Sequence, residues 1–162
     1  MNHVSQAKAR LKARLETHLA TVLAAADTEA DDGFVTPPPM TILTHPSMGT
    51  NDYPVIEMVV QNSRKRVDSV TDDYEHRVML AVTVAGSDEE TIICNLERYI
   101  WALRKFGADH MDRGDMPDPE AVVDVIVCGN EAYTPLLRGK ETGIEHPFVQ
   151  GCFLEMLITT IE

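Results

Sequence analysis

The sequence predicts an α+β fold in which a mainly antiparallel β-sheet of four to five strands is flanked by two helices, in the order α-β-β-β-α-β-β. Three observations predict this class. An amphipathic helical pattern opens the chain, strands with apolar residues on both faces follow, and a strand runs directly into a capped helix near the middle. A length of 162 residues, with 44% hydrophobic and 25% charged residues, fits a single domain spanning 1–162.

The first element is a predicted helix over residues 5–26, with Ser5 as its expected cap. Apolar side chains recur at helical spacing on one stripe, and His18 lies on that stripe as a core histidine. The helix is expected to end in the stretch DTEADDG, because TPPP at 36–39 cannot continue a helix. The stripe comprises Leu11, Leu15, Leu19, Val22 and Ala26.

Three extended segments follow the first helix. MTILTHP at 40–46 predicts a short strand, and YPVIEMVVQNSRK at 53–65 predicts a strand that is apolar on nearly both faces. In the third, His76, Val78, Leu80, Val82 and Val84 alternate with Arg77, Met79, Ala81 and Thr83. The short linker between the second and third segments favours antiparallel pairing. Strands of this kind need cover on both faces.

The second helix has a clear start signal. Ser87 and Glu90 form an S-x-x-E capping box, and Gly107 is the expected C-terminal stop. One stripe of this helix is apolar, and Trp101 points almost directly away from it. The stripe comprises Ile92, Leu96, Tyr99, Ile100 and Leu103.

Two further strands close the chain. AVVDVIVCG predicts a buried strand over 121–128, and FVQGCFLEMLITTIE at 148–162 predicts a long strand with apolar residues on both faces. The stretch NEAYTPLLRGKETGIEHP between them is expected to be a loop.

The charge balance constrains the partners. The chain carries 26 Asp and Glu against 14 Lys and Arg, which gives a net charge of −12. This balance argues against a protein that grips nucleic acid through phosphates. We expect a soluble protein made in the cytoplasm, because the sequence has no membrane-spanning run and no secretory signal. Cys94, Cys128 and Cys152 are widely spaced and are interpreted as buried free thiols.

Motifs for chemistry are sparse. The histidines show no metal-ligand spacing, and the sequence contains no GxSxG, GxxxxGK or GxGxxG motif, so we expect no cofactor and no catalytic residue. The stretch DHMDRGDMPD groups Asp109, His110, Asp112, Asp115 and Asp118, whose oxygens could bind a divalent cation. Its spacing does not match an EF-hand, and a solvated acidic loop is the simpler interpretation.

The candidate interface residues include apolar side chains that are expected to lie outside the core. Trp101 lies opposite the core stripe of its helix, where it could contact a partner or be covered by another segment of the same chain. Paired leucines in the stretch YTPLLRGK suggest docking in the same way. The predicted interface residues are Trp101, Tyr133, Leu136, Leu137 and Arg138.

The order of the predicted elements resembles that of a known protein family. The YPVIEMVV strand, the junction into SDEETIICNLERYIWALRKFG, and the closing pair VDVIVCG and FVQGCFLEMLITTIE resemble the tail terminator, or tail completion, proteins of long-tailed bacteriophages. The resemblance lies in element order, acidity and strand character, from about residue 5 to the end. It leaves the stretches 27–52 and 108–120 without a role.

The resemblance implies a structural virion protein of the tail and neck. Six subunits would form a ring that caps the tail tube, stops tube polymerisation and joins the tail to the head connector. The implied partners are further copies of the chain, the tail tube protein, a neck or stopper protein and the tail sheath protein. Genomic DNA would pass through an acidic lumen without binding specifically.

Two other functions stay open at this stage. One is a different head-to-tail connector or neck protein, which differs from a terminator only in its position in the particle. The other is a small metal-dependent enzyme that uses the loop from Asp109 to Asp115.

Overall fold

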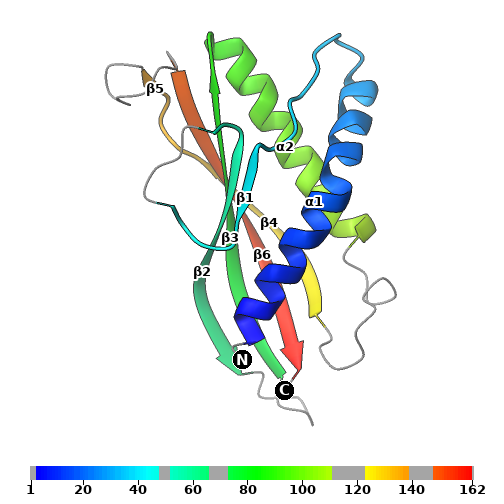
Figure 1. Cartoon of the computed structure of the whole chain (residues 1–162), viewed down its shortest axis with the longest axis vertical. Coiled ribbons are helices and arrows are strands. Elements are labelled where there is room, and N and C mark those ends of the chain that lie inside the picture. Colours follow the sequence, from blue (N-terminus) through cyan, green and yellow to red (C-terminus); the bar gives the residue numbers. More distant parts are fainter. Residues whose placement is uncertain (1–2, 48–51, 66–72, 111–122, 139–147, 162) are drawn as a thin grey trace.

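The computed structural model describes residues 3–47, 52–65, 73–110, 123–138 and 148–161. These residues form two helices and six strands, which confirms the predicted α+β class and adds the two-residue strand β5. Both helices lie together on one side of the sheet (Figure 1). The elements are α1 His3–Ala30, β1 Thr41–Leu43, β2 Val55–Lys65, β3 Asp73–Gly86, α2 Glu89–His110, β4 Val123–Tyr133, β5 Leu137–Arg138 and β6 Phe148–Ile161.

The sheet has the strand order β1-β2-β3-β6-β4, and β5 pairs with β6. Its first pair, β1 with β2, is parallel, and the other pairs are antiparallel, including the predicted pair of β2 with β3. β3 pairs with β6 from Asp73 opposite Ile161 to Gly86 opposite Phe148. Because β6 follows β4 in sequence but lies between β3 and β4, it joins two strands that are far apart in the chain.

The core lies between the helices and one face of the sheet. The predicted row on β3, from His76 to Val84 at every second residue, is buried, with His76 at the polar end of the row. His76 Nδ1 lies 2.8 Å from Ser63 Oγ on the neighbouring strand, so this buried ring has a polar partner. The predicted apolar stripes of both helices are also buried, whereas His18, expected as a core histidine, is half-buried. The alternation along β3 therefore correctly grouped the residues that share the face on which the helices pack.

α1 is longer at both ends than the sequence predicted. It begins at His3, so Ser5 lies inside the helix and does not cap it. It continues through Asp27 to Ala30 and ends where Asp31 and Gly33 adopt positive φ angles of 48° and 77°. These left-handed conformations stop the helix at the residue types that tolerate them, Asp and Gly.

α2 also differs from the prediction at both ends. Its cap is Asp88 rather than Ser87, because Asp88 Oδ1 accepts the backbone N–H of Thr91 at 2.8 Å and Asp88 Oδ2 accepts the Thr91 hydroxyl at 2.9 Å. Gly107 does not end the helix, which runs on to His110. Full burial of Phe106 beside this glycine anchors the last turns to the core and outweighs the low helix propensity of glycine.

The position of the cap gives a first testable prediction. Replacing Asp88 by alanine should lower the midpoint of thermal unfolding, because the N–H of Thr91 loses its acceptor. Replacing Ser87 by alanine should change it far less, since the Ser87 hydroxyl donates only to the Asp88 carboxylate. Thermal melts of both variants followed by circular dichroism compare the two caps. Equal losses would contradict the assignment of Asp88.

The Asp88 carboxylate should also make the stability of the fold depend on pH. The hydrogen bond from the Thr91 backbone holds the pKa of Asp88 below its usual value. The stabilisation is therefore complete above the pKa of the unfolded chain and is lost as pH falls through the lower pKa of the folded state. The Asp88→Ala variant should lose less stability than the parent chain on acidification below about pH 4.

Strand structure replaces much of the described part of the loop predicted after residue 129. β4 extends to Tyr133 instead of ending at residue 128, and its pairing with β6 shifts register between Val127 and Glu131. β5 then lies within the stretch expected to be a loop. Thr134 connects the two elements to β6, since its N–H donates to the Gly151 carbonyl at 2.9 Å and its hydroxyl accepts the Gly151 N–H at 2.8 Å.

Candidate interaction surfaces

The sheet has a second face, on which neither helix packs among the described residues. Strand register places Val59 beside Met79, and Phe153 and Leu157 on the same face of β6. All four side chains are half-buried, whereas the row facing the helices is fully buried. We call this side of the sheet the open face, and it matches the expectation of strands that need cover on both sides.

Charged groups on the open face are held in fixed positions. Arg77 Nε lies 3.1 Å from Glu155 Oε1, and Glu155 is 8% exposed although it faces away from the helices. Glu57 Oε1 accepts both the backbone N–H and the hydroxyl of Ser47 at 2.7 Å. The open face therefore combines half-buried apolar side chains with anchored carboxylates, and part of it is already covered, since Val55 on the same face is 2% exposed.

Trp101 lies where the two helices meet. It is half-buried and packs against the core, and it lines a hollow of about 330 Å³ together with residues from the end of α1 and with Glu97 and Arg98 of α2. The end of α1 thus lies beside Trp101, as the second interpretation of this side chain expected. A part of the indole stays accessible, so Trp101 remains a proposed contact residue.

The other predicted contact residues lie on different sides of the molecule. Tyr133 is 49% exposed and lies within electrostatic range of Glu97 and Arg104 of α2. Leu137 is 44% exposed and pairs with Val149, which places it on the open face. Leu136 packs against the core, and Arg138 pairs with Phe148 through the backbone. The structure therefore does not bring the five predicted residues into one surface.

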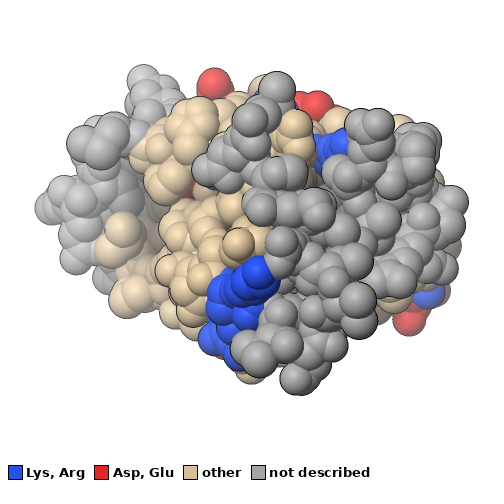
Figure 2. All heavy atoms as spheres, turned by 90° about the horizontal axis from the view of Figure 1, so that it is seen from below, with Lys and Arg blue, Asp and Glu red and all other residues tan. Residues whose placement is uncertain are grey.

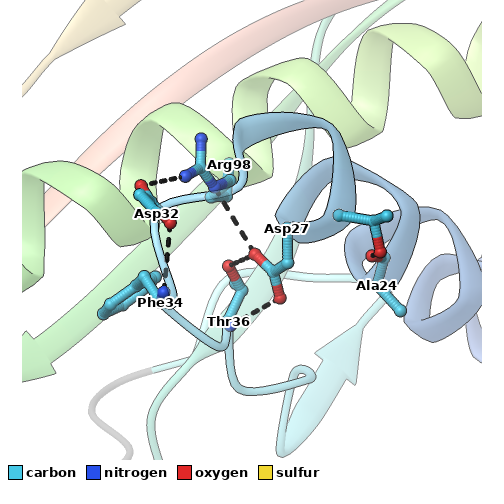
Figure 3. A network of polar contacts seen from close by, with 7 residues as sticks. Ala24, Asp27, Asp32, Phe34, Thr36 and Arg98 are labelled. Atoms are coloured by element: carbon cyan, nitrogen blue, oxygen red, sulfur yellow. Dashed lines mark hydrogen bonds and ion pairs between the residues drawn. The ribbon is translucent and has the colours of Figure 1, made fainter.

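A polar network joins the end of α1 to α2 (Figure 3). The guanidinium of Arg98 lies between two carboxylates, with Nε 3.4 Å from Asp27 Oδ1 and Nη2 bonded to Asp32. Asp27 also accepts the N–H and the hydroxyl of Thr36, at 2.8 and 2.6 Å. Sequence reasoning interpreted DTEADDG only as a helix stop and missed its partner Arg98, which lies 66 residues away from Asp32.

The chain from 33 to 40 crosses the helices and carries apolar side chains into solvent. Tyr99 of α2 donates its hydroxyl to the Pro37 carbonyl at 2.8 Å, which fixes the segment in place. Val35 and Met40 are strongly exposed on it, and Ile93 of α2 is exposed as well. Sequence reasoning used TPPP only as a helix breaker and did not identify this exposed apolar segment.

A hollow of about 520 Å³ lies between this segment and the start of α2. Carboxylates of Asp32, Asp88 and Glu90 line it, together with Cys94. Burial, with smaller contributions from Asp32 and Glu97, raises the pKa of the Cys94 thiol. The described residues contain no group of three His, Cys, Asp or Glu side chains that could hold a metal ion. Of the stretch considered for a cation, Asp109 and His110 are the last residues of α2, and the rest, to Asp118, lies outside the described residues.

The thiols offer a direct check of the core. Cys94 is half-buried and Cys152 is buried, both as free thiols, while the side chain of Cys128 lies outside the described part. Burial raises the pKa of Cys152 to about 12. In a Cys128→Ser background, we expect Cys94 to react with a disulfide reagent at pH 8 and Cys152 to react only on unfolding. Equal rates in the folded protein would contradict this burial.

Fold and surfaces together define a small α+β protein with one helix-covered sheet face and one open face. No protein-family model matches the sequence, and no curated protein sequence matches it. Among solved structures, a chain from the virion of a native gene transfer agent particle matches with a TM-score of 0.48 and 10% sequence identity. The match covers 96% of this chain and 94% of that chain. No described helix has both the length and the apolar character needed to cross a membrane.

Proposed function

We propose that this protein is a structural virion protein, a tail terminator that forms a ring on the end of the phage tail tube. The observation that carries the proposal is the open face, because its half-buried apolar side chains and anchored carboxylates require cover that the described helices do not provide. Neighbouring subunits supply such cover in a closed ring. The protein acts by shape and contact, without a catalytic step.

In this proposal the ring is a hexamer. One side of it binds the tail tube protein and stops polymerisation, and the other side binds the neck or connector protein, with the tail sheath protein as a further neighbour. The order of elements supports this assignment, since it resembles that of tail terminators over most of the chain. The protein then resides in the tail and neck of the virion, after assembly in the host cytoplasm.

The charge of the chain suits a ring through which DNA passes. A net charge of −12 per subunit gives 6 × −12, or −72, for a hexamer. Carboxylates repel the phosphates of double-stranded DNA, and an acidic lumen therefore lets DNA move without sticking.

Replacing Met79 by lysine tests the role of the open face. Met79 is half-buried opposite Glu155, so a lysine there can approach a carboxylate and should leave the monomer folded. The same charge should prevent a neighbour from covering the face, and rings on tube ends should be lost. Gln61→Lys, at an exposed position of β2, is the matched control.

Circular dichroism reports whether each variant folds, and electron microscopy of tube ends reports whether it forms rings. The proposal expects Met79→Lys to fold and fail to cap tubes, and Gln61→Lys to fold and cap them. Normal capping by Met79→Lys would refute the role of the open face. Binding of the parent chain to the neck protein but not to tube ends would favour the alternative of another head-to-tail connector.

A further inference from the structure

Residues 35–40, with the sequence VTPPPM, lie between α1 and β1 and belong to neither a helix nor a strand (Figure 1). The ring of each proline holds φ near about −65°, and a residue that precedes a proline is restricted to extended conformations. Positions 36 to 39 are all constrained in one of these two ways. The segment therefore adopts the polyproline II conformation, which has about three residues per turn. We call residues 35–40 the proline strip.

Burial along the proline strip repeats with the same period. Thr36 is buried and Pro39, one turn later, is half-buried, whereas the other side chains of the strip are exposed. The exposed side chains form two ridges, Val35 with Pro38 and Pro37 with Met40. Val35 is 79% exposed and Met40 is 69% exposed, so both ridges present apolar groups to solvent.

Polar contacts on the inward side hold the proline strip in place. Asp27 accepts the N–H and the hydroxyl of Thr36, which points toward α1 (Figure 3). The Tyr99 hydroxyl donates to the Pro37 carbonyl, and the Met40 N–H donates to a backbone carbonyl at 2.8 Å. These contacts fix the backbone but give no role to the apolar ridges. A backbone that is fixed before binding loses little conformational entropy when a partner binds it.

Carboxylates lie beside the start of the proline strip. A hollow of about 520 Å³ there is lined by Asp32, Asp88 and Glu90, with Phe34 as an apolar wall. Arg98 pairs with Asp32, whereas Glu90 is exposed and pairs with no described cation. The Lys and Arg side chains that Figure 2 shows from below lie toward the other end of the molecule. The start of the strip therefore favours a partner that places a cation beside it.

We propose that the proline strip is a docking segment for a different protein, one with an aromatic-lined groove and a Lys or Arg side chain beside that groove. The inference rests on the proposed function, because it takes this protein to be a neighbour in the particle. Polyproline II segments suit such grooves, since their apolar ridges pack on aromatic side chains and their backbone is already extended.

A second copy of this chain fits the proline strip less well. Trp101 lines a described hollow, and its indole could serve as one aromatic wall. Glu29 and Glu97 line the same hollow, so carboxylates would meet carboxylates if the start of the strip approached it. A different protein is therefore favoured as the occupant.

Two double variants test the docking segment. Val35→Ser with Met40→Ser removes one apolar side chain from each ridge, and Pro37→Ala with Pro38→Ala removes one ring from each and loosens the backbone. Both variants keep the inward polar contacts, so circular dichroism should show folded chains. Binding to preformed tail tubes and to the purified neck protein, both encoded in the same genome, is measured for each. We expect binding to one of these proteins to weaken on the order of tenfold or more.

Matched controls lie outside the proline strip. Pro46→Ala replaces an exposed proline beyond β1 and should bind like the parent chain. Glu90→Lys should weaken binding, because it places a cation opposite the cation of the partner. Glu16→Lys makes the same change at an exposed position of α1 and should not weaken it.

Photo-crosslinking identifies the occupant. Val35→p-benzoylphenylalanine places a crosslinker on one ridge, and mass spectrometry of the crosslinked product identifies the peptide that it reaches. The inference expects a peptide of the tube or neck protein that contains an aromatic residue together with Lys or Arg. A crosslink to a second copy of this chain, or to a peptide without aromatic residues, would overturn it.

The outcomes separate this inference from the proposed function. If the parent chain caps tube ends and both double variants bind tubes and neck protein equally well, the strip is not a docking segment and the proposed ring stands. If the parent chain binds neither tubes nor the neck protein, the proposed function itself fails, and so does the inference that rests on it.

Discussion

Replacing Leu80 by alanine should lower the free energy of unfolding by about 2 to 5 kcal/mol. Leu80 is fully buried on β3, between β2 and β6 and beneath the helices, so its removal leaves a cavity that neighbours on three sides cannot fill. Denaturation by urea measures the change. Leu137→Ala is the control, because Leu137 is exposed and its loss should cost within about 0.5 kcal/mol.

The Leu80 variant also tests which face of the sheet packs against the helices. If the helices packed on the opposite face, Leu80 would be the exposed residue and Met79 the buried one. A loss for Leu80→Ala no larger than that for Met79→Ala would contradict the assignment of the two faces. The alternation of burial along β3 predicts a clearly larger loss at Leu80.

Replacing Arg98 by alanine should lower the free energy of unfolding by about 1 to 3 kcal/mol. Its side chain is mostly buried and lies between Asp27 and Asp32, so its removal leaves the better-buried carboxylate of Asp27 without its cation. Partial exposure of Asp32 reduces the effect through solvent screening. Lys105→Ala on the exposed side of the same helix is the matched control and should cost little.

Acid titration adds a second measurement on the same network. The backbone N–H of Phe34, followed by Arg98, holds the pKa of Asp32 below its usual value. The stabilisation is complete above the pKa of the unfolded chain and is lost as pH falls through the folded pKa. The Arg98→Ala variant should therefore lose less stability than the parent chain between neutral pH and pH 3. An equal loss in both chains would show that Arg98 does not act on the Asp32 carboxylate.

Several parts of the fold could be predicted from local sequence. Period-two alternation from His76 to Val84 predicted β3 and the set of residues that share its buried face, and the spacing of Ile92, Leu96 and Tyr99 predicted the buried stripe of α2. The short connection between β2 and β3 predicted their antiparallel pairing. These features depend on residues close in sequence, where periodicity and turn length carry the information.

Other parts depend on contacts that a single sequence does not reveal. Ser87 and Asp88 are both good caps, and only the contacts of Thr91 distinguish them. Gly107 lies within a helix because Phe106 anchors that turn in the core. The position of β6 between β3 and β4 is a long-range pairing that no local pattern predicts.

The candidate surfaces were predictable only in part. Tyr133 and Leu137 are exposed, but the strand register places them on different faces of the sheet, and their role as contact residues stays a prediction. Trp101 was expected to point away from the core of its helix, but α1 packs beside it and covers part of the indole.

The most direct measurement is electron microscopy of tail tubes assembled with and without this protein. The tubes are formed from the tail tube protein encoded in the same genome, and the purified chain is added during or after assembly. The proposed function predicts a ring at one end of each tube, with tubes that stop growing once the ring is bound. Tubes that keep growing with bare ends at saturating concentrations of the folded chain would contradict it.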